Sequence, residues 1–139
     1  MLRAALQAAS QFPQLKILAL TVITSMSDQD LEEVGVASTV REQVIRLARL
    51  ATSAGCHGVV ASPLEAKLLR ELLPPGGLIV TPGVQMAGDE RGDHARSATA
   101  SQAIDAGATH VVIGRPITRA PNPAAAFAAV HAELTATTR

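Results

Sequence analysis

The amino-acid sequence predicts an α/β fold in which four parallel strands are covered by helices. Four short apolar runs, rich in leucine and β-branched residues, occupy residues 15–23, 58–61, 78–81 and 109–113. Segments with helical spacing separate them, and strands that alternate with helices are typical of βαβ units with right-handed crossovers. The 139 residues and 47% hydrophobic content suit one domain with a buried core, so we treat residues 1–139 as a single unit.

In the first half of the chain, caps and breakers define the helices. An alanine-rich helical pattern covers residues 2–9, and the run LKILALTVI that follows at 15–23 has the near-continuous apolar character of a strand covered on both faces. Ser27 is a predicted N-cap for a helix over residues 28–34. A longer helix over residues 39–54 ends at Gly55. One face of it, expected to be buried, carries Val40, Val44, Leu47, Ala48 and Ala51.

The second half repeats the alternation. After the strand at 58–61, Ser62 and Pro63 begin a helix that runs to residue 73, where the segment PPGG breaks it. The strand at 78–81 leads into a polar loop that ends at residue 97, and Thr99 caps the next helix, to residue 106. The strand at 109–113 and a helix over residues 123–134 complete the chain. We expect that last helix to pack into the core through Ala124, Phe127, Ala128 and Val130.

Two architectures fit four such strands. One is a small open α/β sheet, and the other is half of a (β/α)8 barrel, which in full needs about 250 residues. Periodicity does not choose between them. The chain begins inside a helix with no strand before it, which favours a segment of something longer.

The composition excludes several classes of function. Twelve basic and twelve acidic residues balance and are scattered, so we expect no binding to nucleic acid and none to an anionic membrane. No signal peptide or membrane-spanning run is present, which favours a cytoplasmic protein. The single cysteine, Cys56, has no partner for a disulfide or a metal pair and is expected to be a small packed residue. The four histidines show no ligand spacing, so we expect no metal.

Five short motifs carry a family resemblance. They are LTVITSM at residues 20–26, GVVAS with a following EA at 58–66, VTPGV at 80–84, GDH at 92–94 and VIGRPIT at 112–118. In this order and at this spacing the chain resembles the C-terminal half of bacterial orotidine 5'-phosphate decarboxylase, from about residue 15 to residue 134.

The resemblance implies a fold and an activity. The fold is the C-terminal half of a (β/α)8 TIM barrel, with four parallel strands and covering helices. Members of the family are usually homodimers. They convert orotidine monophosphate to UMP and carbon dioxide, a step of pyrimidine biosynthesis, without cofactor or metal.

The resemblance also implies substrate-binding residues. Thr24, with Ser25 beside it, matches the pyrimidine contact, whereas Gly114 and Arg115 match the phosphate site. A guanidinium offers a planar fork suited to phosphate oxygens. The rule that barrel enzymes bind substrate at the carboxyl ends of their strands gives the same placement independently.

Two positions depart from the commoner family pattern. Gln85 stands where a phosphate-binding arginine is usual, and His94 stands where a glutamine is usual. Both side chains still donate hydrogen bonds, but a neutral amide contributes less to a dianion than a guanidinium. A protonated His94 would restore part of the lost charge.

The family's catalytic lysine and aspartate array is absent from this chain. The only lysines are Lys16, at the start of a strand, and Lys67, inside a helix, and neither lies in the family's D-x-K-x-x-D motif. We therefore predict no catalytic residue in this chain and no activity for the chain alone.

Each candidate also has an ordinary structural explanation. Arg115 is equally suited to a surface ion pair, Thr24 and Ser25 to capping the helix at residue 28, and His94 to a solvated loop. Two functions stay open: part of an orotidine 5'-phosphate decarboxylase, or a non-catalytic half-barrel that binds a phosphorylated ligand or assembles into a barrel. The outer edges at 15–23 and 109–113 are predicted to make the chain oligomeric or prone to aggregation.

Overall fold

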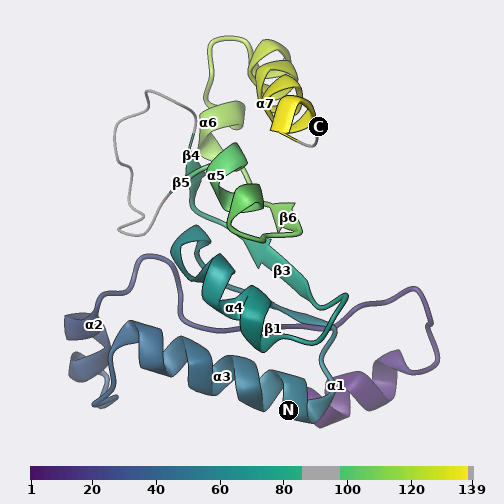
Figure 1. Cartoon of the computed structure of the whole chain (residues 1–139), viewed down its shortest axis with the longest axis vertical. Helices are drawn as coiled ribbons and strands as arrows, with labels where there is room; N and C mark the ends of the chain where they lie inside the picture. The colour runs from purple at the N-terminus through teal and green to yellow at the C-terminus, as the bar shows by residue number, and fades with distance from the viewer. Residues whose placement is uncertain (86–97, 138–139) are drawn as a thin grey trace.

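Four short parallel strands form the main sheet of the computed structural model, which describes residues 1–85 and 98–137. In chain order and in space they are β1 (Leu18–Leu20), β2 (Gly58–Val60), β3 (Leu78–Thr81) and β6 (His110–Val111) (Figure 1). Neighbouring strands pair in parallel throughout. The predicted parallel sheet is therefore confirmed, with its strands in the predicted order.

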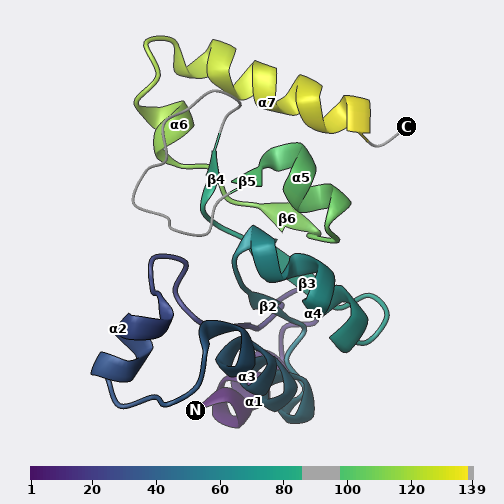
Figure 2. The same cartoon turned by 60° about the vertical axis from the view of Figure 1, so that its left-hand side comes forward.

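Helices follow the strands as predicted. They are α1 (Leu2–Ala9), α2 (Asp28–Glu33), α3 (Val40–Ala54), the 3-10 turn η1 (Pro63–Glu65), α4 (Ala66–Leu72), α5 (Ala100–Asp105), α6 (Arg115–Thr118) and α7 (Pro123–Thr137). Figure 1 shows α3 and α4 side by side along the sheet, while Figure 2 shows α1 and α7 at opposite ends of the molecule.

Three helices begin with capping boxes, at the predicted caps Ser27 and Thr99 and at Thr39, which was predicted to lie inside the helix. The side chains of Ser27, Thr39 and Thr99 each accept the backbone N–H three residues on, and the side chain at that position returns a bond to the cap's own backbone. Such reciprocal bonds satisfy two N–H groups that the first turn of a helix leaves without partners. Gly55 ends α3 with a φ of +91°, a conformation that favours glycine.

The core lies between one face of the sheet and the helices. Val44, Ala48 and Ala51 of α3 are buried in this core, as predicted, and so is Leu69 of α4. From the sheet, Val59 and Ile79 contribute fully buried side chains.

The strands are shorter than the apolar runs that predict them. Ahead of β1, the Leu15 N–H donates to the Phe12 carbonyl at 2.9 Å, so the first residue of the predicted strand closes a turn instead. After β1, a second turn joins Met26 to Ile23 at 3.0 Å. Apolar character thus extends past the point where the backbone leaves the ladder.

Three short elements were not predicted. Val84–Gln85 (β4) pairs in parallel with Ala98–Thr99 (β5) as a small second sheet, and residues 115–118 form the helix α6 instead of a loop. Two-residue strands and a single helical turn are too short for hydrophobic periodicity to register.

The predicted core stripe of the last helix is mostly wrong. Phe127 is 62% exposed, and Ala124 and Ala128 are exposed as well, so of that stripe only Val130 is buried. The helix lies at the end of the molecule, where the described residues cover one side of it (Figure 2).

Candidate functional site

The carboxyl ends of the strands meet at one edge of the sheet. Beyond the paired residues, the Thr21 N–H donates to the Val60 carbonyl at 3.0 Å and the Ala61 N–H to the Val80 carbonyl at 3.1 Å. At the far strand, the Val112 N–H donates to Thr81 at 2.9 Å. These bonds keep the strand ends level, so the loops that follow them emerge from the same edge.

Buried polar side chains gather at this edge. In the part of the chain that the structure describes, all the buried polar or charged residues lie at or just after the carboxyl ends of β1, β2 and β3: Thr21, Thr24, Ser62, Glu65 and Thr81. Burying polar groups costs free energy unless they are hydrogen-bonded. A polar layer confined to one edge of an otherwise apolar core is typical of a binding site.

Thr24 belongs to this layer, whereas its neighbour does not. The Thr24 side chain is 5% exposed, and Ser25 is exposed. The alternative that these residues cap α2 is wrong, because Ser27 is the N-cap and its hydroxyl accepts from the Asp30 N–H. Thr24 therefore belongs to the buried polar layer and not to the cap of α2.

Gln85 is placed by a turn after β3. Gly83 has a φ of +79°, which redirects the chain from Thr81 into β4. There Gln85 is half-buried and lies opposite Thr99. The predicted phosphate contact His94 lies outside the described residues.

Gly114 and Arg115 follow β6, at the other end of the sheet from Thr24. The Gly114 carbonyl accepts the N–H groups of Ile117 and Thr118, both at 3.0 Å, which starts α6, and Arg115 is exposed. Two strands separate β1 from β6. The structure thus places Thr24, Gln85, Gly114 and Arg115 after the carboxyl ends of strands along the same edge.

Sequence reasoning missed the buried pair Ser62 and Glu65. Ser62 is fully buried and its hydroxyl donates to a Glu65 carboxylate oxygen, although the sequence suggested only a helix cap. The available signal was positional, since Thr24, Ser62 and Thr81 are hydroxyl residues at the ends of three consecutive apolar runs.

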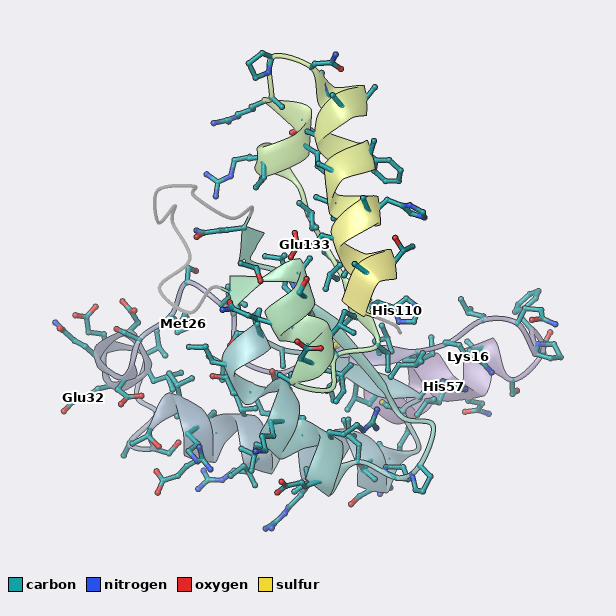
Figure 3. All side chains as sticks on the ribbon, turned by 45° about the horizontal axis from the view of Figure 1, so that its top comes forward. Lys16, Met26, Glu32, His57, His110 and Glu133 are labelled. Carbon is teal, nitrogen blue, oxygen red and sulfur yellow. The ribbon has the colours of Figure 1, made fainter. Side chains whose placement is uncertain are left out.

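Neither lysine is a buried member of this polar layer. Lys16 precedes β1 and Lys67 lies on α4, and both are exposed. Figure 3 shows Lys16 beside His57 on the side of the molecule away from Met26, which comes two residues after Thr24.

Other reactive groups give no site among the described residues. Partial burial raises the pKa of the Cys56 thiol, which keeps it protonated and unreactive. Within the described ranges no three of the metal-binding residue types cluster closely enough to hold an ion. No helix in those ranges combines the length and apolarity needed to cross a membrane.

Comparison with known proteins gives consistent results. Residues 1–130 match the model of the orotidine 5'-phosphate decarboxylase / HUMPS family. Orotidine 5'-phosphate decarboxylases of Anaeromyxobacter dehalogenans and Thermobifida fusca are 47% and 49% identical to 96% of this chain.

A solved structure agrees with these relatives. The crystal structure of orotidine 5'-phosphate decarboxylase from Lactobacillus acidophilus superposes on 96% of the chain with a TM-score of 0.76 and 37% identity. The chain covers 57% of that structure and 58% and 56% of the two relatives, so the fold is about half of a (β/α)8 barrel. With its motifs, its sheet and these matches in agreement, the chain belongs to the orotidine 5'-phosphate decarboxylase / HUMPS family.

Proposed function

We propose that this chain is the phosphate- and pyrimidine-binding part of a cytoplasmic orotidine 5'-phosphate decarboxylase and does not catalyse decarboxylation alone. The observation that carries the proposal is the edge at which the strands end. Residues that match the family's binding motifs follow the strands there, among buried polar side chains, while Lys16 precedes β1 and Lys67 is exposed on α4.

In this proposal Arg115 is the main phosphate ligand. It is exposed at the carboxyl end of β6, and a guanidinium binds a phosphate through two parallel charged hydrogen bonds. Gly114 allows close approach of the backbone beside it. Gln85, the last residue of β4, adds a neutral donor, and His94 completes the phosphate contacts.

Thr24 is the pyrimidine contact in the same proposal. Its burial after β1 suits a hydroxyl that fixes the orientation of a base rather than one that is solvated. Ser25 is exposed beside it, where a bound ligand would cover it.

Binding without catalysis follows from the positions of the lysines. Loss of carbon dioxide leaves a carbanion, which a correctly placed proton donor must protonate. Lys16 is at the amino end of β1, at the opposite end of the strand from Thr24, and Lys67 is exposed on α4. Remote phosphate binding lowers a barrier only when the reacting groups are present.

Calorimetry with UMP tests the binding half of the proposal. We expect Arg115→Ala to weaken UMP binding by about 1.5–3 kcal/mol, the usual worth of a hydrogen bond to a charged group. Arg119→Ala is the matched control, because it removes an equal charge from an exposed residue one helical turn further on. Equal effects of the two variants would contradict a phosphate site at Arg115.

An assay of orotidine monophosphate turnover tests the other half. We expect no turnover by the purified chain. Turnover that is lost in Lys16→Ala or Lys67→Ala would show that the chain carries its own proton donor and would overturn the proposal.

A further inference from the structure

In the turn η1 an apolar side chain is exposed and a charged side chain is buried. Leu64 is 61% exposed, whereas the next residue, Glu65, is 8% exposed. Ser62, which precedes the turn, is 0% exposed. Burying a carboxylate costs free energy, and burying the leucine would gain it. Stability alone therefore does not account for this arrangement.

The side chains of Ser62 and Glu65 are bonded to each other. Ser62 is the N-cap residue of η1, yet its side chain makes no capping bond, and its hydroxyl donates to a Glu65 carboxylate oxygen. The main chain closes the turn by itself, since the Glu65 N–H donates to the Ser62 carbonyl at 3.2 Å. The bond between the side chains is thus additional to what the turn requires.

The turn that carries this pair packs against α5. In both views of the molecule α5 lies between α4 and α7 (Figures 1 and 2), and η1 contacts it. Small side chains allow the elements to approach closely, because Ala61 and Ala66 beside the pair and Ala100 and Ala103 of α5 are all at most 1% exposed. A hydrogen bond is directional, so the buried pair fixes the shape of the surface on which α5 rests.

The same helix carries the residue that stands beside Gln85. α5 contacts both strands of the small sheet, and its N-cap, Thr99, is the residue of β5 opposite Gln85 in β4. The Thr99 N–H donates to the side chain of Gln102 at 3.0 Å, so the end of β5 is bonded to the first turn of α5. A displacement of α5 therefore moves Thr99, and with it Gln85.

We propose that Glu65, held by Ser62, is a positioning residue that sets where Gln85 stands at the carboxyl edge of the main sheet. It acts from η1 through α5 and Thr99, and needs no contact with a ligand. Its consequence for ligand binding rests on the proposed function, in which Gln85 donates to a phosphate group.

Amide NMR spectra of the purified chain without ligand test the positioning. We expect Ser62→Ala, which removes one buried oxygen, and Glu65→Ala to shift the same resonances, those of the Gln85 and Thr99 amides. Glu65→Gln keeps an acceptor for the Ser62 hydroxyl, so both resonances should stay near their wild-type positions. Glu71→Ala is the matched control, because it removes the same side chain from an exposed position on α4.

Calorimetry with UMP tests whether the effect on a ligand passes through Gln85. We expect Gln85→Ala to raise the dissociation constant about fivefold, as for the loss of a neutral hydrogen bond. Glu65→Ala should raise it by no more than that factor, and by less than about twofold in the Gln85→Ala background, because two residues that act through one contact are not additive. A merely structural role of Glu65 would weaken binding equally in both backgrounds.

Three results would overturn the proposal. They are unchanged Gln85 and Thr99 resonances in Ser62→Ala and Glu65→Ala, equal shifts from Glu71→Ala, or equal losses of UMP affinity with and without the Gln85 side chain. If Glu65→Ala does not fold, Ser62→Ala carries the same comparisons.

Failure of the proposed function is a separate result. A wild-type chain that does not bind UMP, or a Gln85→Ala variant that binds it as well as the wild type, would contradict the phosphate contact of Gln85. The resonances measured without ligand would still decide whether Glu65 positions that residue.

Discussion

At the scale of single residues, His57 joins two strands through its own backbone and ring. Its Nδ1 accepts the Ile17 N–H at 2.9 Å, its N–H donates to the Ile17 carbonyl at 2.9 Å, and its carbonyl accepts the Leu78 N–H at 3.0 Å. Because Nδ1 is an acceptor here, a neutral ring carries its proton on Nε2. The residue therefore has a structural role at the amino ends of the strands.

The capping boxes of α3 and α5 differ in one charge. In α3 the backbone N–H and the hydroxyl of Thr39 both donate to Glu42 at 3.0 Å, and in α5 the neutral Gln102 accepts the Thr99 N–H at 3.0 Å. The bonds from Thr39, its backbone N–H first, lower the pKa of Glu42 below its usual 4.5. The ionised form is thus favoured by folding.

We predict that Glu42→Gln weakens the dependence of stability on acid. A carboxyl whose pKa is lowered by folding stabilises the protein above its unfolded pKa, here 4.5, and this contribution is lost as pH falls through the lower folded value. Glutamine keeps the capping bonds, as Gln102 does in α5, but does not titrate. Urea unfolding at about pH 7 and about pH 3 measures the difference.

The control for this prediction is Glu32→Gln. Glu32 is exposed on α2 and lies outside the capping boxes, so the same charge is removed without touching a cap. The prediction would be contradicted if the free energy of unfolding of Glu42→Gln fell between about pH 7 and about pH 3 by as much as that of the wild type.

Residues at helix starts could be predicted from the sequence, whereas the buried polar layer could not. Ser27 and Thr99 are caps because they bond to residues three positions further along the chain. Such local bonds can be predicted from the sequence. Ser62 and Glu65 are buried only because α5 and the strand ends pack over them. That packing joins residues far apart in the chain, which no local pattern encodes.

At the scale of elements, the Glu133 side chain of α7 is hydrogen-bonded to the start of α5. Its Oε1 accepts both the Ser101 N–H at 3.1 Å and the Ser101 hydroxyl at 2.6 Å. Ser101 lies in the first turn of α5, whose N–H groups have no partner within the helix. Glu133 therefore acts as a cap supplied by another helix.

We predict that Glu133→Ala loosens α7 before the rest of the protein. Removing the acceptor costs roughly 1–2 kcal/mol, the typical value for a cap. In the described part of α7, Val130 is buried and Leu134 is partly buried against the core, so the helix buries few apolar side chains. Hydrogen exchange should show faster exchange of α7 amides, while those of α3 are unchanged.

Glu133→Gln keeps an acceptor at the same position and serves as the conservative variant. It should retain most of the protection of α7. Uniform acceleration of exchange in α3 and α7 by Glu133→Ala would mean that the two helices unfold together, contrary to the prediction.

Elements were predictable in kind and order but less so in length. The runs at 15–23 and 109–113 predicted strands, and the ladder uses Leu18–Leu20 and His110–Val111. Apolar residues outside the ladder are selected for burial, not for strand geometry, so periodicity cannot mark where pairing stops. The same reason explains why β4 and β5, each two residues long, were not predicted.

At the scale of the whole molecule, the sequence described only in part the open face of the main sheet, on which Leu20 is exposed and Val60 and Val80 are half-buried. A continuous apolar run such as 15–23 predicts cover on both faces, and the residues show which side chains need it. The helices that follow the strands all lie to one side, which depends on the handedness of the crossovers. What covers the second face is a question of assembly.

We predict that the urea midpoint of the wild-type chain rises with chain concentration. The exposed sheet face and the outer strand edges are expected to make the chain oligomeric. For a dimer, unfolding releases two chains, and each tenfold rise in concentration adds about 1.4 kcal/mol of apparent stability per pair. Leu20→Lys places a charge on that face, so its midpoint should be nearly independent of concentration, whereas Leu50→Lys, at a similarly exposed leucine on α3, should follow the wild type. A wild-type midpoint that is constant over a hundredfold range of concentration, about 2.7 kcal/mol of expected change, would mean that each chain folds alone and that its open face is stable in water.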